Sequence, residues 1–392
     1  MSDAHFDDAF DALVHAYQER DRAAVEWKAR GGQVVGCLGT DVPEEFLIAA
    51  GILPVRVCGS AADGGAAAFA EEAADRYIER AFDPHVRSQF ARIVVQGAYR
   101  YLDYLIVSSS SDALVRVFYY LRALRQCEPG LPVPDLYCFD LVHSRYRTSA
   151  LYNHDRAREF RRVVEGWRGD AIADSALAQA IDTCNEDRGL LRQLAALRGP
   201  DLPRVTGVEA LQITGASMFL PRDEHSRLLR AFLSEARART ALPGVRVFVT
   251  GSQQDHSRFY ELVESCRAVI VAEDHDWGNR HFEGDVDPAA DPAAAIVDRY
   301  HMRSPAASRA SISARVKALV EQVCAARAQG VIAFVYQKDD APSWDWPEQR
   351  RALQAAGIPV LLLDNQPYPM GDAESLRREV LAFIAACREV VQ

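Results

Sequence analysis

Short apolar runs alternate with amphipathic stretches along most of the chain. Each run is rich in Val, Ile and Leu and stops at polar or acidic residues. Runs of this kind, separated by segments with helical periodicity, are typical of parallel strands buried on both faces of a sheet. We therefore expect strands at Gln33–Cys37, Leu53–Cys58, Tyr104–Ser108, Pro134–Phe139, Val245–Val249, Ala268–Ala272, Val331–Tyr336 and Pro359–Leu363.

The expected strands fall into two series, separated by a charged helical stretch with few strand formers. Each series predicts one doubly wound parallel sheet, so the expected fold class is α/β, with two Rossmann- or flavodoxin-like parallel-sheet halves. The expected domains are residues 1–148, an N-terminal helix (Phe6–Arg30) with the first half; 149–204, a helical connector; and 205–392, the second half with a C-terminal helix (Ala373–Val391).

Composition and charge exclude several classes of protein. Apolar residues make up 49% of the chain and charged residues 26%, as in a globular protein with a sizeable core. The net charge of −10 argues against a general nucleic-acid surface, which needs a basic patch. No apolar run approaches the roughly 18 residues of a membrane span. The N-terminus is acidic and lacks the order of a signal peptide, so the expected location is the cytoplasm.

The eight cysteines are scattered, and none forms a C-x-x-C pair. Their spacing therefore offers no zinc ribbon and no ferredoxin-type site. Most of them lie in apolar or helical contexts, so we expect small buried thiols kept reduced in the cytosol.

The stretch Val247–Gly284 carries the densest candidate chemistry. Its first strand ends in Thr250-Gly251-Ser252, whose backbone N–H groups and hydroxyls suit a phosphate or carboxylate. Its second strand ends in Glu273–His281, where an acid beside a histidine suits proton transfer, and an arginine with a tryptophan suits an anionic or planar ligand. The plain alternatives are a β-to-α turn and a solvated loop.

Ligands in open α/β sheets bind beyond the carboxyl ends of strands, which makes these strand ends the first candidates for a site. Ser108–Ser111 also ends a strand, although a helix N-cap explains Ser111 equally well. Lys338-Asp339-Asp340 holds the corresponding position in the second half, where a polar turn is the alternative. The candidate catalytic residues are His275, Asp276 and Glu273, and the candidate substrate-binding residues are Thr250, Gly251, Ser252, Trp277, Arg280 and Ser111.

The segment Val42–Val57, VPEEFLIAAGILPVRV, resembles the opening motif of the 2-hydroxyacyl-CoA dehydratase and benzoyl-CoA reductase subunit family, P-E-E-L-I-x-A-A-G-x-x-P-V-R. Further matches follow in the family's order and extend to about Asp364. They are YLDYLIVSSSSDALVR, VFVTGS, VIVAEDHDWGNRHF, RYHMRSP, GVIAFVYQKDD and AAGIPVLLLD.

The resemblance implies a two-half α/β subunit that pairs with a homologous subunit in a homodimer or heterodimer. In the family, each subunit typically holds a [4Fe–4S] cluster through cysteines between the halves. An ATP-hydrolysing activator delivers one electron, and the pair then dehydrates a 2-hydroxyacyl-CoA or reduces an aromatic acyl-CoA. The implied small-molecule partner is thus an acyl-CoA.

This chain departs from the family at the cluster cysteines. Asp83, Ser111 and Asp339 stand where the family has cysteine, and Ser304 stands in its C-P pair. Because such clusters are held by thiolates, three replacements disfavour a cluster, although Cys37 and Cys138 lie near strand ends of the first half. Oxygen ligands suit acid–base chemistry or a hard cation, but nothing in the spacing demands a metal, so no cofactor is assigned.

Four hypotheses about function remain open. The leading one is a subunit with a degenerate cluster site that helps to form an acyl-CoA site beside a cluster-bearing homologue. The next is a stand-alone, air-tolerant, non-redox enzyme on an acyl thioester or another activated acid, with His275 and Asp276 in proton transfer. The others are a redox subunit with an unusually ligated cluster and a binding protein without catalysis.

Overall fold

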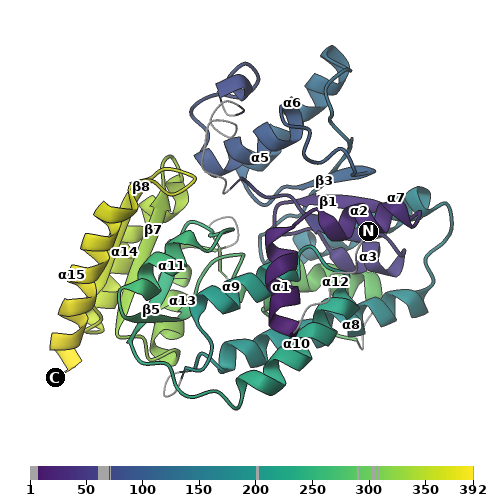
Figure 1. The fold of residues 1–392 in the computed structure, drawn as a ribbon. Helices are drawn as coiled ribbons and strands as arrows, with labels where there is room; N and C mark the ends of the chain where they lie inside the picture. Colours follow the sequence, from purple (N-terminus) through teal and green to yellow (C-terminus); the bar gives the residue numbers. More distant parts are fainter. Residues whose placement is uncertain are drawn as a thin grey trace.

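A computed structural model describes residues 8–60, 70, 72–199, 203–288, 291–301, 305–306 and 310–391. Ser304 lies outside these residues. Figure 1 shows two α/β halves, the first coloured purple to blue and the second mostly green to yellow, with the helices α8 and α10 running beneath them.

The first half is built on a four-stranded parallel sheet in the order β2-β1-β3-β4. The strands β1 and β3 are buried almost throughout, which explains why they appear in the sequence as unbroken apolar runs. The strands are β1 (Val34–Leu38), β2 (Leu53–Arg56), β3 (Tyr104–Ser108) and β4 (Asp135–Phe139); the helices are α3 (Glu44–Ala49), α5 (Pro84–Val94) and α6 (Asp112–Cys127).

The second half repeats this arrangement, with a four-stranded parallel sheet in the order β6-β5-β7-β8. The predicted fold class, an α/β protein with two parallel-sheet halves, is therefore confirmed. The strands are β5 (Val245–Gly251), β6 (Ala268–Glu273), β7 (Gly330–Tyr336) and β8 (Val360–Gln366); the helices are α11 (Arg258–Ser265), η1 (Asn279–Phe282), α13 (Ile312–Ala325), α14 (Asp340–Ala355) and α15 (Ala373–Val391).

Helices also link the two halves. Ile296 and Tyr300 of α12, a segment that follows β6, join one apolar cluster with Val35 and Phe46 of the first half. The linking helices are α7 (Arg147–Arg168), α8 (Asp174–Ala196), α9 (Gly207–Ala216), α10 (Arg222–Ala236) and α12 (Pro292–His301). The domain boundaries after residues 148 and 204 remain predictions.

The prediction of one N-terminal helix over Phe6–Arg30 is wrong, because two helices occupy that segment, α1 (Ala9–Gln18) and α2 (Arg22–Ala29). The helical conformation is interrupted at Glu19, whose ψ of 59° is not helical. Next to the break, the Arg20 side chain donates to the backbone oxygen of Asp255 in the second half. The break lets α1 pack against α9 and α10, while α2 contacts the first sheet.

Across the part of the chain that the structure describes, none of the helices combines the length and the apolar character needed to cross a membrane.

Candidate functional site

Loops from both sheets line one cavity of about 460 Å³ between the halves. In each sheet the central pair of strands, β1 with β3 and β5 with β7, is the point where the chain order reverses. Ligands bind at such switch points, beyond the carboxyl ends of the strands. The residues that follow these four strands and line the cavity are Gly39, Thr40, Ser110, Ser111, Ser252, Gln253, Lys338 and Asp339.

All six predicted substrate-binding residues line this cavity, which we call the cleft. Several of their side chains already contact other residues of the protein. The Ser252 hydroxyl donates to Asp339 Oδ2 over 2.6 Å, and the Arg280 guanidinium pairs with Asp274. Trp277 is 3% exposed and lies beneath the Arg20 guanidinium. The predicted binding residues are Ser111, Thr250, Gly251, Ser252, Trp277 and Arg280.

The predicted catalytic residues divide between the cleft and the core. Asp276 lines the cleft, whereas Glu273 and His275 are buried away from it. Glu273 Oε1 accepts from Arg198 Nη1 over 2.9 Å, in an ion pair that is almost fully buried. Burial alone would raise the pKa of Glu273, but the Arg198 charge outweighs it and lowers that pKa. The pair fixes the end of β6 in the protein interior.

His275 has a similar structural environment. Its Nε2 lies 2.7 Å from the Tyr260 hydroxyl, and the ring is 1% exposed. Burial lowers the pKa of His275 to about 4, so the imidazole is neutral at physiological pH. A neutral, hydrogen-bonded ring in the core is a weak candidate for proton exchange with a ligand in the cleft.

The three positions matched to family cysteines, Asp83, Ser111 and Asp339, all line the cleft. Asp83 is the N-cap of α5, where its Oδ1 accepts the Val86 N–H over 2.9 Å. Ser111 is the N-cap of α6. Burial raises the pKa of Asp339 to about 6, and the charge of Asp83 contributes to the same shift. The first and second halves thus each supply a carboxyl group with a raised pKa to one cavity.

Sequence reasoning missed an imidazole–carboxylate pair at the cleft. His85 lines the cavity, and its Nε2 lies 3.1 Å from Oδ2 of Asp255, which is fully buried. The Asp255 carboxylate also accepts from the Tyr368 hydroxyl and from the Gly59 N–H. Burial would lower the pKa of His85, but Asp255 more than offsets it, and the net shift is upward. The available signal was Asp255 in the loop after β5, four positions beyond the strand's last residue, Gly251.

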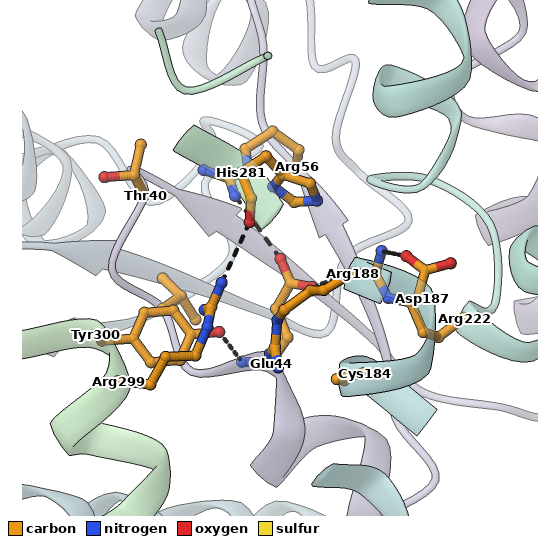
Figure 2. Close-up of a pocket in the computed structure, with 11 residues that line it drawn as sticks. Thr40, Glu44, Arg56, Cys184, Asp187, Arg188, Arg222, His281, Arg299 and Tyr300 are labelled. Carbon is orange, nitrogen blue, oxygen red and sulfur yellow. Dashed lines mark hydrogen bonds and ion pairs between the residues drawn. The ribbon is translucent and has the colours of Figure 1, made fainter. Parts of the chain in front are cut away.

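A second, smaller pocket of about 30 Å³ adjoins the cleft and shares Thr40 and Arg56 with it. Figure 2 shows arginines from several elements pointing into it alongside the Glu44 and Asp187 carboxylates. Arg222 pairs with both of these acids, and Asp187 also lies 2.6 Å from His225 Nδ1. Its volume is enough for about one water molecule, which is too small for a substrate. We therefore interpret the surrounding side chains as an ion network between the halves. Its arginines are Arg56, Arg188, Arg222 and Arg299.

Residues 39–385 match the family described as 2-hydroxyglutaryl-CoA dehydratase, D-component. The chain belongs to this family. Among its relatives, the (R)-phenyllactyl-CoA dehydratase beta subunit of Clostridium sporogenes is 22% identical over 90% of this chain and 91% of that protein. The (R)-2-hydroxyglutaryl-CoA dehydratase beta subunit of Acidaminococcus fermentans is 23% identical over 94% and 97%. A benzoyl-CoA reductase subunit of Thauera aromatica is 25% identical over 70% of each chain.

The cleft of this D-component family member does not suit a thiolate-held cluster. Its lining contains acids and hydroxyls but no cysteine among the described residues. Cys37 is buried in the core of the first sheet and Cys138 lies in β4, and burial raises the pKa of both thiols. Nor does any group of three or more His, Cys, Asp or Glu side chains in the described ranges form a metal site. The donor set present therefore does not match the group that the family resemblance implies.

Proposed function

We propose that this chain is an acyl-CoA-binding subunit of a complex like the 2-hydroxyacyl-CoA dehydratases and benzoyl-CoA reductases. One observation carries the proposal: in a chain of this family, loops from both halves line a single cavity. Its volume of about 460 Å³ falls within the range of small-molecule sites, roughly 300–1,000 Å³. The acyl thioester lies against Thr250, Gly251 and Ser111 at the strand ends.

Two cations at the cleft suit the phosphates of coenzyme A. Arg116 of α6 lines the first-half side, with a side chain 49% exposed, and Lys338 lines the second-half side from the loop after β7. Partly exposed cations attract phosphate groups over several ångströms and pair with them on contact. In the proposed complex these two side chains hold the nucleotide end of the ligand.

Isothermal titration of the full chain with butyryl-CoA tests the binding role. We expect Arg116→Ala and Lys338→Gln each to weaken binding about 3–10-fold, an effect that shrinks at high salt as phosphate contacts are screened. Lys317→Ala is the matched control, since Lys317 is an exposed helical cation of α13. Absence of butyryl-CoA binding, or equal affinities for all variants at low salt, contradicts the proposed site.

The partner in this proposal is a homologous subunit that keeps its cysteines, and an ATP-dependent activator serves that partner. Support comes from the names of the relatives, each of which is one subunit of a dehydratase or reductase. Anaerobic purification from the native host tests this arrangement by protein identification and iron analysis of each subunit. We expect iron in the partner only. Isolation of this chain with no homologue, or with iron and sulfide of its own, is the contrary result.

A second candidate function is a non-redox enzyme acting alone on an acyl thioester or another activated acid. The observation favouring it is the pair of carboxyl groups with raised pKa values, Asp83 and Asp339, at the cleft. The discriminating measurement is turnover by the purified, iron-free chain in air. Turnover under those conditions assigns the chemistry to this chain, and dependence on a cluster-bearing partner rejects the stand-alone function.

A further inference from the structure

The cleft holds more acid–base chemistry than ligand binding requires. Asp83 comes from the first half and Asp339 from the second, and hydrogen bonds orient both carboxyl groups. Asp83 accepts a backbone N–H at the start of α5, and Asp339 accepts the Ser252 hydroxyl. Ser252 is itself fixed, because its Oγ accepts the Tyr336 N–H over 2.9 Å. Two oriented carboxyl groups from opposite halves therefore line the same cavity.

The electrostatics keep these carboxyl groups able to exchange protons. Burial raises the pKa of Asp339 to about 6, and burial likewise raises the pKa of Asp83. A group whose pKa lies near the working pH both accepts and donates a proton readily. Perturbed carboxyl groups lining a cavity are also a mark of functional sites, because a fold gains nothing in stability from them.

His85 adds an imidazole whose two ring nitrogens are both held by protein partners. Asp255 lies 3.1 Å from Nε2, and the Gln253 amide nitrogen lies 2.9 Å from Nδ1. The ring is 2% exposed and stacks parallel to Tyr336 at a centroid distance of 6.5 Å. The raised pKa of His85 favours the imidazolium form. Because the buried Asp255 carboxylate pairs with this imidazolium, the ring orders the cavity wall beside Asp83 and adds no net charge there.

We propose that Asp339 and Asp83 are the catalytic acid–base pair of the cleft and act on an acyl thioester that carries a hydroxyl on its β carbon. The Asp339 carboxylate removes the Cα proton, and the C–H electron pair moves into the thioester carbonyl to form an enolate beside His85. The carbonyl then re-forms, the pair makes the Cα=Cβ bond, and the Cβ–O bond breaks. The Asp83 carboxyl gives its proton to the departing oxygen, which leaves as water.

The substrate class follows from the chemistry that these residues supply. A thioester carbonyl acidifies the hydrogen on Cα, so a carboxylate can remove it when the hydroxyl is on Cβ. In a 2-hydroxyacyl thioester, the hydrogen to be removed is on Cβ, which the carbonyl does not activate. Proton transfer alone therefore fits the 3-hydroxyacyl class, and the step needs no oxidant or reductant. The inference rests on the proposed binding of an acyl thioester and deepens the second candidate function, the non-redox enzyme.

Hydrogen–deuterium exchange into butyryl-CoA isolates the first proton transfer, because this thioester cannot lose water. The full chain is incubated with butyryl-CoA in D2O, and mass spectrometry follows deuterium at Cα. We expect exchange with the wild type and a fall of about 100-fold or more with Asp339→Asn. Asp83→Asn should keep the exchange but lose the formation of the enoyl thioester from 3-hydroxybutyryl-CoA. Asp364→Asn, at an exposed carboxyl of β8, is the matched control.

Calorimetric affinity for butyryl-CoA, measured on each variant, separates the possible failures. Wild-type binding without exchange overturns the acid–base pair and leaves the binding role intact. Exchange that persists in Asp339→Asn overturns the assignment of Asp339. Partial rescue by Asp339→Glu, with unchanged affinity, supports proton transfer over a merely structural role. Absence of binding by the wild type removes the proposed function and this inference together.

Discussion

At the scale of single residues, the direction in which a side chain points decides its role. Glu273, His275 and Asp276 are close neighbours at the end of one strand, yet of the three only Asp276 lines the cleft. Glu273 is held by Arg198, a residue 75 positions earlier in the chain, and His275 by Tyr260. The residue types alone suggested proton transfer, but the partners that turn two of these side chains inward are remote in sequence.

Burying the Asp339 carboxyl group in the cleft should lower the stability of the protein, and this effect can be measured. Its folded-state pKa of about 6 lies above the ordinary value of 3.8, so the fold prefers the protonated form. Wild-type stability should therefore fall as the pH rises from about 4 to 6, whereas Asp339→Asn does not ionise. We expect the variant to be more stable at pH 7.5 by about 1–2 kcal/mol, after allowing for the weaker bond to Ser252, and to show no gain at pH 4.

Urea unfolding of wild type and Asp339→Asn across this pH range measures the difference. Asp364→Asn is the control for a change of charge at an exposed position. Parallel stability curves for wild type and Asp339→Asn would contradict the raised pKa of Asp339.

At the scale of helices and strands, much of the architecture could be predicted from the sequence. The strands are short apolar runs because both faces of each sheet are covered, and the sharp polar ends of the runs give their boundaries. The rule that strand ends meet at one edge correctly brings Thr250, Ser111 and Asp339 to one cavity. The break at Glu19 was not foreseen, because the contact beside it joins Arg20 to Asp255, which lies 235 residues away in the second half.

The end of β5 depends on a glycine. Gly251 has a φ of +106°, and a Cβ there would lie 2.3 Å from the backbone oxygen of Phe334 in β7. Gly251→Ala therefore forces β5 and β7 apart at the cleft, and we expect a loss of stability of about 2–4 kcal/mol. The lower melting temperature should come with weaker binding of butyryl-CoA.

Gly284→Ala is the matched control for this prediction. Gly284 also has a positive φ, of +63°, but a Cβ there would meet no atom within 4 Å. The control should lose only the backbone contribution, about 1 kcal/mol. Equal losses of stability in the two variants would show that the close approach of β7 to Gly251 does not affect the free energy of unfolding.

At the scale of the whole molecule, buried ions join the halves. Glu45 of α3 is fully buried and pairs with Arg188 of α8, and it also accepts from the Tyr300 hydroxyl of α12 over 3.0 Å. The Arg188 charge lowers the pKa of Glu45 against the opposing effect of burial. The arginines of the small pocket in Figure 2 come from β2, α8, α10 and α12, so the ion network crosses from the first sheet to the linking helices.

Glu45→Gln tests this network. The substitution leaves the Arg188 guanidinium buried without its counter-ion, and we expect a loss of about 3–5 kcal/mol in the free energy of unfolding. Glu186→Gln removes an exposed pair with Arg230 on the neighbouring helix and should cost less than about 1 kcal/mol. Chemical denaturation compares the two. Similar small losses for both variants would mean that the buried network does not hold the halves together.

The docking of α1 on the second half has a consequence for synthesis on the ribosome. The Tyr17 hydroxyl donates to the backbone oxygen of Asp255, 238 residues further along the chain. At roughly 5–20 residues per second, the partner of this first helix emerges about 10–50 s after it. The apolar face of α1 has no permanent cover until α9 and α10, which it packs against, have also emerged. The first α/β half can form early, but α1 can dock on the second half only after nearly two thirds of the chain has been made.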